Sequence, residues 1–303
     1  MSRSSYEPWP ELSYEHFGPT GHLLHMITQI IGKLKLATPF EPQWANVALW
    51  VTSRGLTTGA IPDGPGTFGV TLDLVDHRID IATSWGARSG FELSACSVAE
   101  AYERIFAELE DAEVAAVINP MPQEIPHPVR CDVDTEFRPY DAQLANAWWR
   151  ALASSEQVMR RYHARFWGPT PPIGLMWGTF DLRDVRLNGS RIVPGPDIGY
   201  IRRNAMDREQ IESGWWAGSD AYPRPAYFSF TYPQPEGIER AELSTGRWDA
   251  ALGLFVLDYE EVRTAADPAA MLLGFLESSY EAGAAAIGWD RALVTSGSPD
   301  TVR

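Results

Sequence analysis

The order in which helical and strand periodicities follow one another limits the folds open to this chain. Apolar residues recur at helical spacing over residues 21–36, and apolar and polar residues alternate over 67–84, which is typical of a hairpin. Ser97 and Glu100 then form a capping box before a helical segment over 98–112. The first part of the chain therefore predicts a helix, a largely antiparallel sheet and a second helix.

The same order returns further along the chain. A long helix is predicted over 140–166, and Asp267 followed by Pro268 predicts the start of a last helix. Between them lie strand segments with the sequences IGLMWGTFDLRDVRLNG, ESGWWAGS, PAYFSFTYP and GLFVLDYEEV. Because helices lie only at the ends of each run, we predict an α+β fold of two similar helix–antiparallel sheet–helix units packed around a cleft. The likeness of the two runs favours an internal duplication.

A segment rich in proline and acidic residues, PMPQEIPHPVRCDVDTEFRPYD, interrupts these patterns after a predicted strand over 114–120. We therefore place a first α+β unit at residues 1–125 and a second one at 126–303, with the crossover at 120–140. A single composite domain is the alternative, because 303 residues suit one large domain or two moderate ones.

Composition excludes several classes of function. The formal net charge of -15 repels phosphate backbones, and no run of lysine and arginine offsets it, so nucleic acid is not an expected partner. No stretch approaches the roughly 18 to 20 consecutive apolar residues of a membrane span, and no apolar run near the N-terminus suggests an export signal. The two cysteines, Cys96 and Cys131, lack metal-type spacing. We expect a soluble, cytoplasmic protein without a cofactor or a membrane partner.

The helix over 21–36 carries an unusual polar stripe opposite its apolar arc, formed by His22, His25, Gln29 and Lys33. Histidine and glutamine stand where a solvent-facing helix usually carries glutamate and lysine. His22 and His25 are three residues apart, but two histidines alone make a weak metal site. His25 and Gln29, one turn apart, suit hydrogen bonding to a ligand or to a strand edge.

Two charged residues lie in informative surroundings. Arg54, in the turn-like sequence SRGLTTG, can hold an anion with its guanidinium fork or pair with one of the 40 acidic residues. Asp181 lies among apolar neighbours in MWGTFDL, where an ionised carboxylate is costly unless it is paired. Either Asp181 pairs with a cation such as Arg186, or it points into a cleft as an acid or base.

Tryptophan is abundant, with 12 residues, and two doublets occur at Trp148-Trp149 and Trp215-Trp216. Neighbouring residues on a regular helix or strand cannot both point inward, so one member of each doublet is expected to face a cleft or an interface. Plain core packing of both doublets is the alternative.

Several blocks resemble, in order, a bacterial family of domains of unknown function. The blocks are LHMITQIIGKLKL, WANVALWVTSRGLTT, MWGTFDL, PAYFSFTYPQPEG and FLESSYEAGAAAIGWD. The family pattern is LHxxxQIxGKxxL, then NHWWNVxLYVTxRGLTT, then SPVHFFWGSFDL, then AYSHE. The resemblance spans nearly the whole chain and implies no established activity. The residues that match the pattern and can bind a small polar or anionic molecule are His25, Gln29, Lys33, Arg54, Trp177, Asp181 and Glu209.

Three histidines of the family pattern are replaced here by Gln43, Gly174 and Arg208. If these histidines form a metal centre in relatives, this chain cannot build it, because glycine has no ligand atom and arginine presents only donors. Independent loss of the three histidines is the alternative. The resemblance therefore implies no metal site in this chain.

Three classes of function remain. The first is binding of a small polar or anionic molecule in a cleft between the two units, without metal chemistry. The second is an acid/base enzyme, a hydrolase or a transferase, that uses His25 with Asp181 or Glu209. The third is a protein-interaction module with exposed tryptophans. The chain has no nucleophile-elbow serine and no phosphate-binding glycine loop, so no catalytic residue is assigned.

Overall fold

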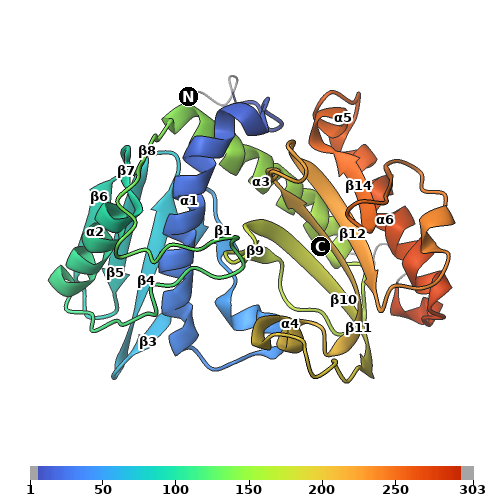
Figure 1. Cartoon of the computed structure of the whole chain (residues 1–303), viewed down its shortest axis with the longest axis horizontal. Helices are drawn as coiled ribbons and strands as arrows, with labels where there is room; N and C mark the ends of the chain where they lie inside the picture. The colour runs from blue at the N-terminus through green and yellow to red at the C-terminus, as the bar shows by residue number, and fades with distance from the viewer. Residues whose placement is uncertain (1–5, 295–303) are drawn as a thin grey trace, which may run out of the picture. The chain divides into compact units, whose positions relative to one another are not determined.

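The chain folds into helices and antiparallel sheets, which confirms the predicted α+β class (Figure 1). The computed structural model describes residues 6–294. Two compact units are present. The first contains residues up to Glu41, together with Ala45–Ala153 and Gly174–Asp181. The second contains Pro42–Trp44, Ser154–Ile173 and the residues from Leu182 onward.

The predicted long helix is present as α3 (Ala142–His163), and the chain passes from one unit to the other inside it, between Ala153 and Ser154. The proline-rich segment at 120–140 lies within the first unit. None of the helices in the part of the chain that the structure describes combines the length and apolar character that crossing a membrane requires.

The first unit consists of an antiparallel sheet with helices packed on it, and in Figure 1 its strands run from blue to teal. The strand order is β1-β2-β4-β5-β6, with β3 paired to β4. The strands are β1 (Trp50–Val51), β2 (Gly55–Thr57), β3 (Ile61–Asp63), β4 (Gly66–Asp73), β5 (Arg78–Thr83) and β6 (Arg88–Glu92). The helices are α1 (Tyr14–Leu34) and α2 (Val98–Asp111), and the unit also contains β7 (Cys96–Ser97), β8 (Phe137–Arg138) and β9 (Gly174–Met176).

Alternation along the predicted hairpin directs one face of this sheet to the core. Val70 pairs with Ile81 and Leu72 with Ile79 across β4 and β5, and all four side chains are buried. Ser97 accepts a hydrogen bond from the backbone N–H of Glu100, so the predicted capping box begins α2.

The second unit contains a sheet of order β13-β14-β12-β11-β10, with α6 packed against β11 and β12. Its strands are β10 (Asp181–Arg191), β11 (Arg208–Trp216), β12 (Ala226–Tyr232), β13 (Arg247–Asp249) and β14 (Leu254–Asp258). Its helices are the last part of α3, α4 (Tyr200–Ala205), α5 (Tyr259–Arg263) and α6 (Pro268–Ala286). As predicted, Asp267 caps α6, accepting a hydrogen bond from the N–H of Ala270.

Two local predictions are wrong. The first helix begins at Tyr14 rather than at 21, because Gly18 and Pro19 obscure the helical pattern of its first turns. Residues 114–120 form no strand. Around Asn119 and Met121, backbone carbonyls accept hydrogen bonds from a side chain of α1 instead of from a neighbouring strand.

Of the two interpretations of the tryptophan doublets, core packing holds for Trp148-Trp149, which are 0% and 6% exposed. Trp148 stacks on Phe180, with ring centroids 4.9 Å apart, and Nε1 of Trp149 donates to the carbonyl of Thr52 at 3.2 Å. Both rings are buried because α3 is covered on more than one side. In the other doublet Trp215 is buried and its neighbour is partly exposed.

Gly32 in α1 permits close packing within the first unit, because the Trp177 ring lies where a Cβ atom of residue 32 would stand. Nε1 of Trp177 also donates to the carbonyl of Val47 at 3.0 Å, which fixes the ring in place. The helix can approach this ring only with glycine at position 32.

Gly32→Ala is expected to lower the free energy of unfolding by about 1–3 kcal/mol, because the added methyl group overlaps the indole. Urea denaturation followed by circular dichroism measures the change. Gly18→Ala in the same helix is the control, because a Cβ there meets no atom within 4 Å, and its effect is expected to stay below about 1 kcal/mol. Equal effects of the two substitutions would contradict the packing argument.

Candidate functional site

The polar stripe of α1 faces backbone groups of the first unit. Nε2 of His25 lies 3.0 Å from the carbonyl oxygen of Trp177 and 3.1 Å from that of Gly178. Both partners are acceptors, so the hydrogen bonds place the proton on Nε2. Burial lowers the pKa of His25 to about 4, although the two carbonyl contacts act in the opposite direction. His25 is therefore a neutral hydrogen-bond donor at neutral pH.

Gln29 and Lys33 continue the same pattern one and two turns further along α1. The Gln29 amide donates to the carbonyl of Gln123 at 2.7 Å and accepts from its N–H at 3.0 Å, as a paired strand would. Nζ of Lys33 donates to the carbonyls of Asn119, at 2.8 Å, and Met121. Both side chains are buried, and burial lowers the pKa of Lys33. The stripe thus anchors an irregular stretch of backbone.

The structure brings Trp177 to this stripe, because its carbonyl accepts from His25 and its ring packs on Gly32. Asp181, also in the first unit, is buried and accepts a hydrogen bond from the hydroxyl of Thr179. None of the hydrogen bonds of His25 among the described residues leads to Asp181 or Glu209. These side chains contact other parts of the first unit, which favours a structural role for them over ligand binding.

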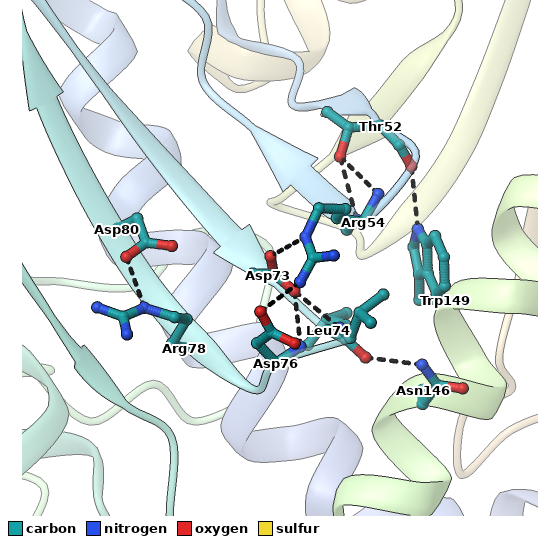
Figure 2. Close-up of polar contacts among 11 residues, drawn as sticks. Thr52, Arg54, Asp73, Leu74, Asp76, Arg78, Asp80, Asn146 and Trp149 are labelled. Carbon is teal, nitrogen blue, oxygen red and sulfur yellow. Dashed lines mark hydrogen bonds and ion pairs between the residues drawn. The ribbon is translucent and has the colours of Figure 1, made fainter. Parts of the chain in front are cut away.

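Arg54 lies elsewhere in the first unit, in a polar cluster at the end of the β4–β5 hairpin (Figure 2). Its guanidinium contacts Asp73 at 2.5 Å and Asp76 at 2.6 Å. Partial burial raises the pKa of Asp73, but hydrogen bonds from Arg54 and from the N–H groups of Asp76 and Val75 outweigh it, so the net pKa is lowered. Of the two interpretations of Arg54, the structure contains the ion pair with acidic neighbours.

Figure 2 also shows how α3 holds the loops on either side of this cluster. Nε1 of Trp149 donates to the carbonyl of Thr52, and the Asn146 amide donates to the carbonyl of Leu74 at 2.8 Å. These bonds fix the turn that carries Arg54.

Glu209 belongs to the second unit. Its Oε2 accepts from the Asn188 amide at 2.5 Å and from Nε1 of Trp289 at 3.2 Å. The predicted residues therefore separate into the α1 stripe with Trp177, the hairpin cluster of Arg54, and Glu209 beside Trp289.

The positions of the three replaced histidines fall in both units. In the second unit, Nε2 of Gln43 donates to Asp207 at 3.1 Å, and Asp207 directly precedes Arg208 in the chain. Gln43 has a left-handed backbone with a φ of 62°, and its Oε1 is buried without a partner. Gly174 lies in the first unit, where a Cβ would stand 2.8 Å from that of Ala48. A histidine at 174 thus requires its neighbours to move.

Residues 6–294 contain no group of three or more histidine, cysteine, aspartate or glutamate side chains placed to hold a metal ion. Gln210 resembles Gln43 in one respect: its Oε1 is also buried without a partner. Its amide nitrogen contacts the sulfur of Met206 at 3.1 Å. Neither buried amide could be predicted from the sequence, because glutamine side chains are common at surfaces.

A pocket of about 810 Å³ lies in the second unit, and the sequence analysis did not predict it. Strand β10 directs Arg186 to it, and the last two turns of α6 supply much of its wall. The lining residues are Arg165, Arg186, Glu277, Tyr280, Glu281, Ala284, Ala285, Gly288, Trp289, Asp290, Arg291 and Val294. Trp289 lines this pocket and donates a hydrogen bond to the predicted residue Glu209.

Arg186 is 2% exposed, yet it forms no ion pair with any carboxylate among the described residues. Its guanidinium carbon lies 3.4 Å from the ring centroid of Tyr162, 4.4 Å from that of Tyr280 and 5.1 Å from that of Phe166. One terminal nitrogen donates to the carbonyl of Tyr162 at 2.5 Å, and Nε has no partner. This buried cation beside a pocket is therefore contacted by rings and a carbonyl, and by no carboxylate of the described residues.

A histidine–carboxylate pair also occurs in the second unit. Nδ1 of His163, at the end of α3, lies 2.6 Å from Oδ1 of Asp184 on β10. The Asp184 side chain is fully buried with Oδ2 unpartnered, whereas that of His163 is 27% exposed. The sequence analysis missed this pair because its members are 21 residues apart, on different elements.

A family model described as a family of unknown function (DUF5996) matches residues 9–296. No curated protein and no solved structure matches the chain.

The low pKa of His25 predicts a loss of stability in acid. The unfolded chain binds a proton below about pH 6.5, whereas the folded one resists protonation to about pH 4, so the free energy of unfolding falls between these values. The contribution is at most about 3.5 kcal/mol, at about 1.4 kcal/mol per pKa unit. Urea midpoints of the wild type and of His25→Gln, measured from pH 7 to pH 4, test this.

The substitution is expected to flatten this part of the pH profile, because glutamine donates to the same carbonyls without titrating. His127→Gln changes an exposed histidine and serves as the control. Parallel profiles of the wild type and His25→Gln would exclude the assigned role of His25.

Proposed function

Because the chain belongs to DUF5996, a family of unknown function, we propose its function from its own residues: it binds a small anionic molecule in the pocket around Arg186. The observation that carries this proposal is the buried guanidinium without a carboxylate partner. The proposal retains the predicted ligand class and locates the site within the second unit.

Charge balance supports an anion at this position. A buried charge is costly unless it is paired, and the three rings around Arg186 offset only part of that cost, at about 0.5–2 kcal/mol for each cation–π contact. A carboxylate or phosphate oxygen can accept the unused N–H groups in charge-assisted hydrogen bonds, which are worth about 1.5–3 kcal/mol each. Arg186 therefore gains more from an anion than from water.

The pocket is also of suitable size, because small-molecule sites commonly enclose about 300–1,000 Å³. Tyr280, Trp289 and Ala284 offer apolar surface beside the charge. Arg186 as a purely internal cation, held by the carbonyl of Tyr162, is the competing interpretation.

Arg186→Gln is expected to weaken binding of acetate and inorganic phosphate to the full chain by at least about tenfold, because it removes the charge and keeps a polar side chain. Isothermal titration calorimetry measures the affinities. Arg191→Gln, at the exposed end of the same strand, is the control and is expected to bind as the wild type does.

Arg186→Lys provides a second test if the glutamine variant is poorly folded by near-ultraviolet circular dichroism. Lysine keeps the charge without the planar fork and is expected to give an intermediate affinity. The proposal is wrong if neither anion binds to the wild type, or if both bind equally to Arg186→Lys and the wild type.

A second candidate function is acid/base catalysis by His163 with Asp184 in place of the predicted His25. The observation that favours it is the 2.6 Å contact, in which the buried carboxylate orients a partly exposed imidazole. Asp184 accepts a hydrogen bond from the Nδ1–H of His163, so Nε2 is left as the basic nitrogen. Such a pair can accept a proton from water that attacks an ester or a related substrate.

Hydrolysis of p-nitrophenyl acetate tests this candidate. Water attacks the ester carbonyl, Nε2 accepts its proton and p-nitrophenolate leaves. His163→Gln is expected to lower the rate at least about tenfold, and Asp184→Asn to lower it less. His127→Gln again serves as the control, and a rate unaffected by His163→Gln excludes the assignment.

A further inference from the structure

The charges around the Arg186 pocket indicate what kind of anion it takes. Its lining contains three basic residues, Arg165, Arg186 and Arg291, and three acidic ones, Glu277, Glu281 and Asp290. Arg165 and Glu277 pair with each other. The remaining lining charges are two positive and two negative. Because they sum to zero, the pocket as a whole does not attract a multiply charged anion.

The unpaired charges differ in depth. Arg186 is buried, whereas Glu281, Asp290 and Arg291 are exposed at residues that line the same pocket. The Glu281 side chain has no ion-pair or hydrogen-bond partner among the described residues, and within them the Asp290 carboxylate accepts only from the N–H of Ala292. The pocket therefore offers a cation inside, with two carboxylates and one guanidinium nearer to solvent.

The geometry of helix α6 accounts for the position of the glutamates in the pocket wall. Glu277, Glu281 and Ala285 follow one another at intervals of four residues, so they lie along one face of the helix toward its C-terminus. The helix ends at Ala286, and the partial negative charge of a helix C-terminus favours a positive group nearby. Ala284, Ala285 and Gly288 leave space beside the rings of Tyr280 and Trp289.

We propose that the ligand is zwitterionic, namely an α-amino acid with an apolar side chain. Its carboxylate contacts Arg186, its ammonium group faces Glu281 and Asp290, and its side chain packs beside Tyr280 and Trp289. This inference rests on the proposed anion site and adds the second charge and the apolar part. A free phosphate satisfies Arg186 but leaves the carboxylates unpaired.

Calorimetry with L-leucine and L-phenylalanine, each compared with its N-acetyl and amide derivatives, tests the proposal on the full chain. The N-acetyl compounds keep the carboxylate alone, and the amides keep the ammonium group alone. At least one free amino acid is expected to bind about tenfold more tightly than both of its derivatives.

Glu281→Gln is expected to remove this preference. The affinity for the free amino acid should fall to that for its N-acetyl form, and the affinity for the N-acetyl form should stay unchanged. Asp290→Asn is expected to act in the same direction. Glu242→Gln, the same change at an exposed glutamate away from the pocket, is the control and is expected to keep the preference.

The outcomes separate the two proposals. If acetate or an N-acetyl compound binds through Arg186 and neither free amino acid binds more tightly than its N-acetyl form, the zwitterion inference is wrong and the anion site stands. If no carboxylate compound binds, both proposals fail. If the preference survives both Glu281→Gln and Asp290→Asn, the placement of the ammonium group is wrong.

Discussion

Hydrogen bonds from side chains of α1 to backbone carbonyls hold the first unit together where it has no regular structure. Buried carbonyl groups need partners, and in sheets and helices the backbone supplies them. Around residues 119–123 and 177–178 the partners are Lys33, Gln29 and His25 instead. These three polar side chains of α1 therefore supply hydrogen bonds that the irregular neighbouring backbone lacks.

The second unit presents the opposite case at Arg186. Here a charge is buried among Tyr162, Tyr280 and Phe166, but its hydrogen-bonding capacity is only partly used, and it borders a pocket. A buried polar side chain whose hydrogen bonds are all made within the protein, such as Gln29, indicates a structural role. A buried charge with unused donors indicates a site for a binding partner. This difference is why the proposed site lies at Arg186 and not at the more conspicuous stripe of α1.

Local patterns predicted most of the secondary structure. The 67–84 hairpin, the capping box at Ser97 and the proline start of α6 each depend on residues close together in the chain. The strand predicted at 114–120 is wrong because an apolar run gives no information about which groups will pair with its backbone. The internal duplication and the cleft between the units stay predictions.

The candidate site was harder to predict than the fold. The cage around Arg186 combines rings from α3, α6 and the turn after α3, and no spacing in the sequence relates them. Of the predicted binding residues, Glu209 belongs to the same unit as this pocket and accepts a hydrogen bond from Trp289, which lines it. Arg186 lies in a strand segment that alternates charged and apolar residues, which is no unusual pattern, and we interpreted it only as a possible partner of Asp181.

The composition of the first unit has a consequence for synthesis on the ribosome. Gly174–Asp181 belong to this unit, but they are translated after Ser154–Ile173 of the other one. The carbonyls that His25 contacts belong to Trp177 and Gly178, so they emerge about 150 residues after the histidine itself. The N-terminal unit therefore cannot finish folding as soon as its main sheet leaves the exit tunnel, because His25 of α1 lacks these two acceptors until the turn at residues 177–178 has been synthesised.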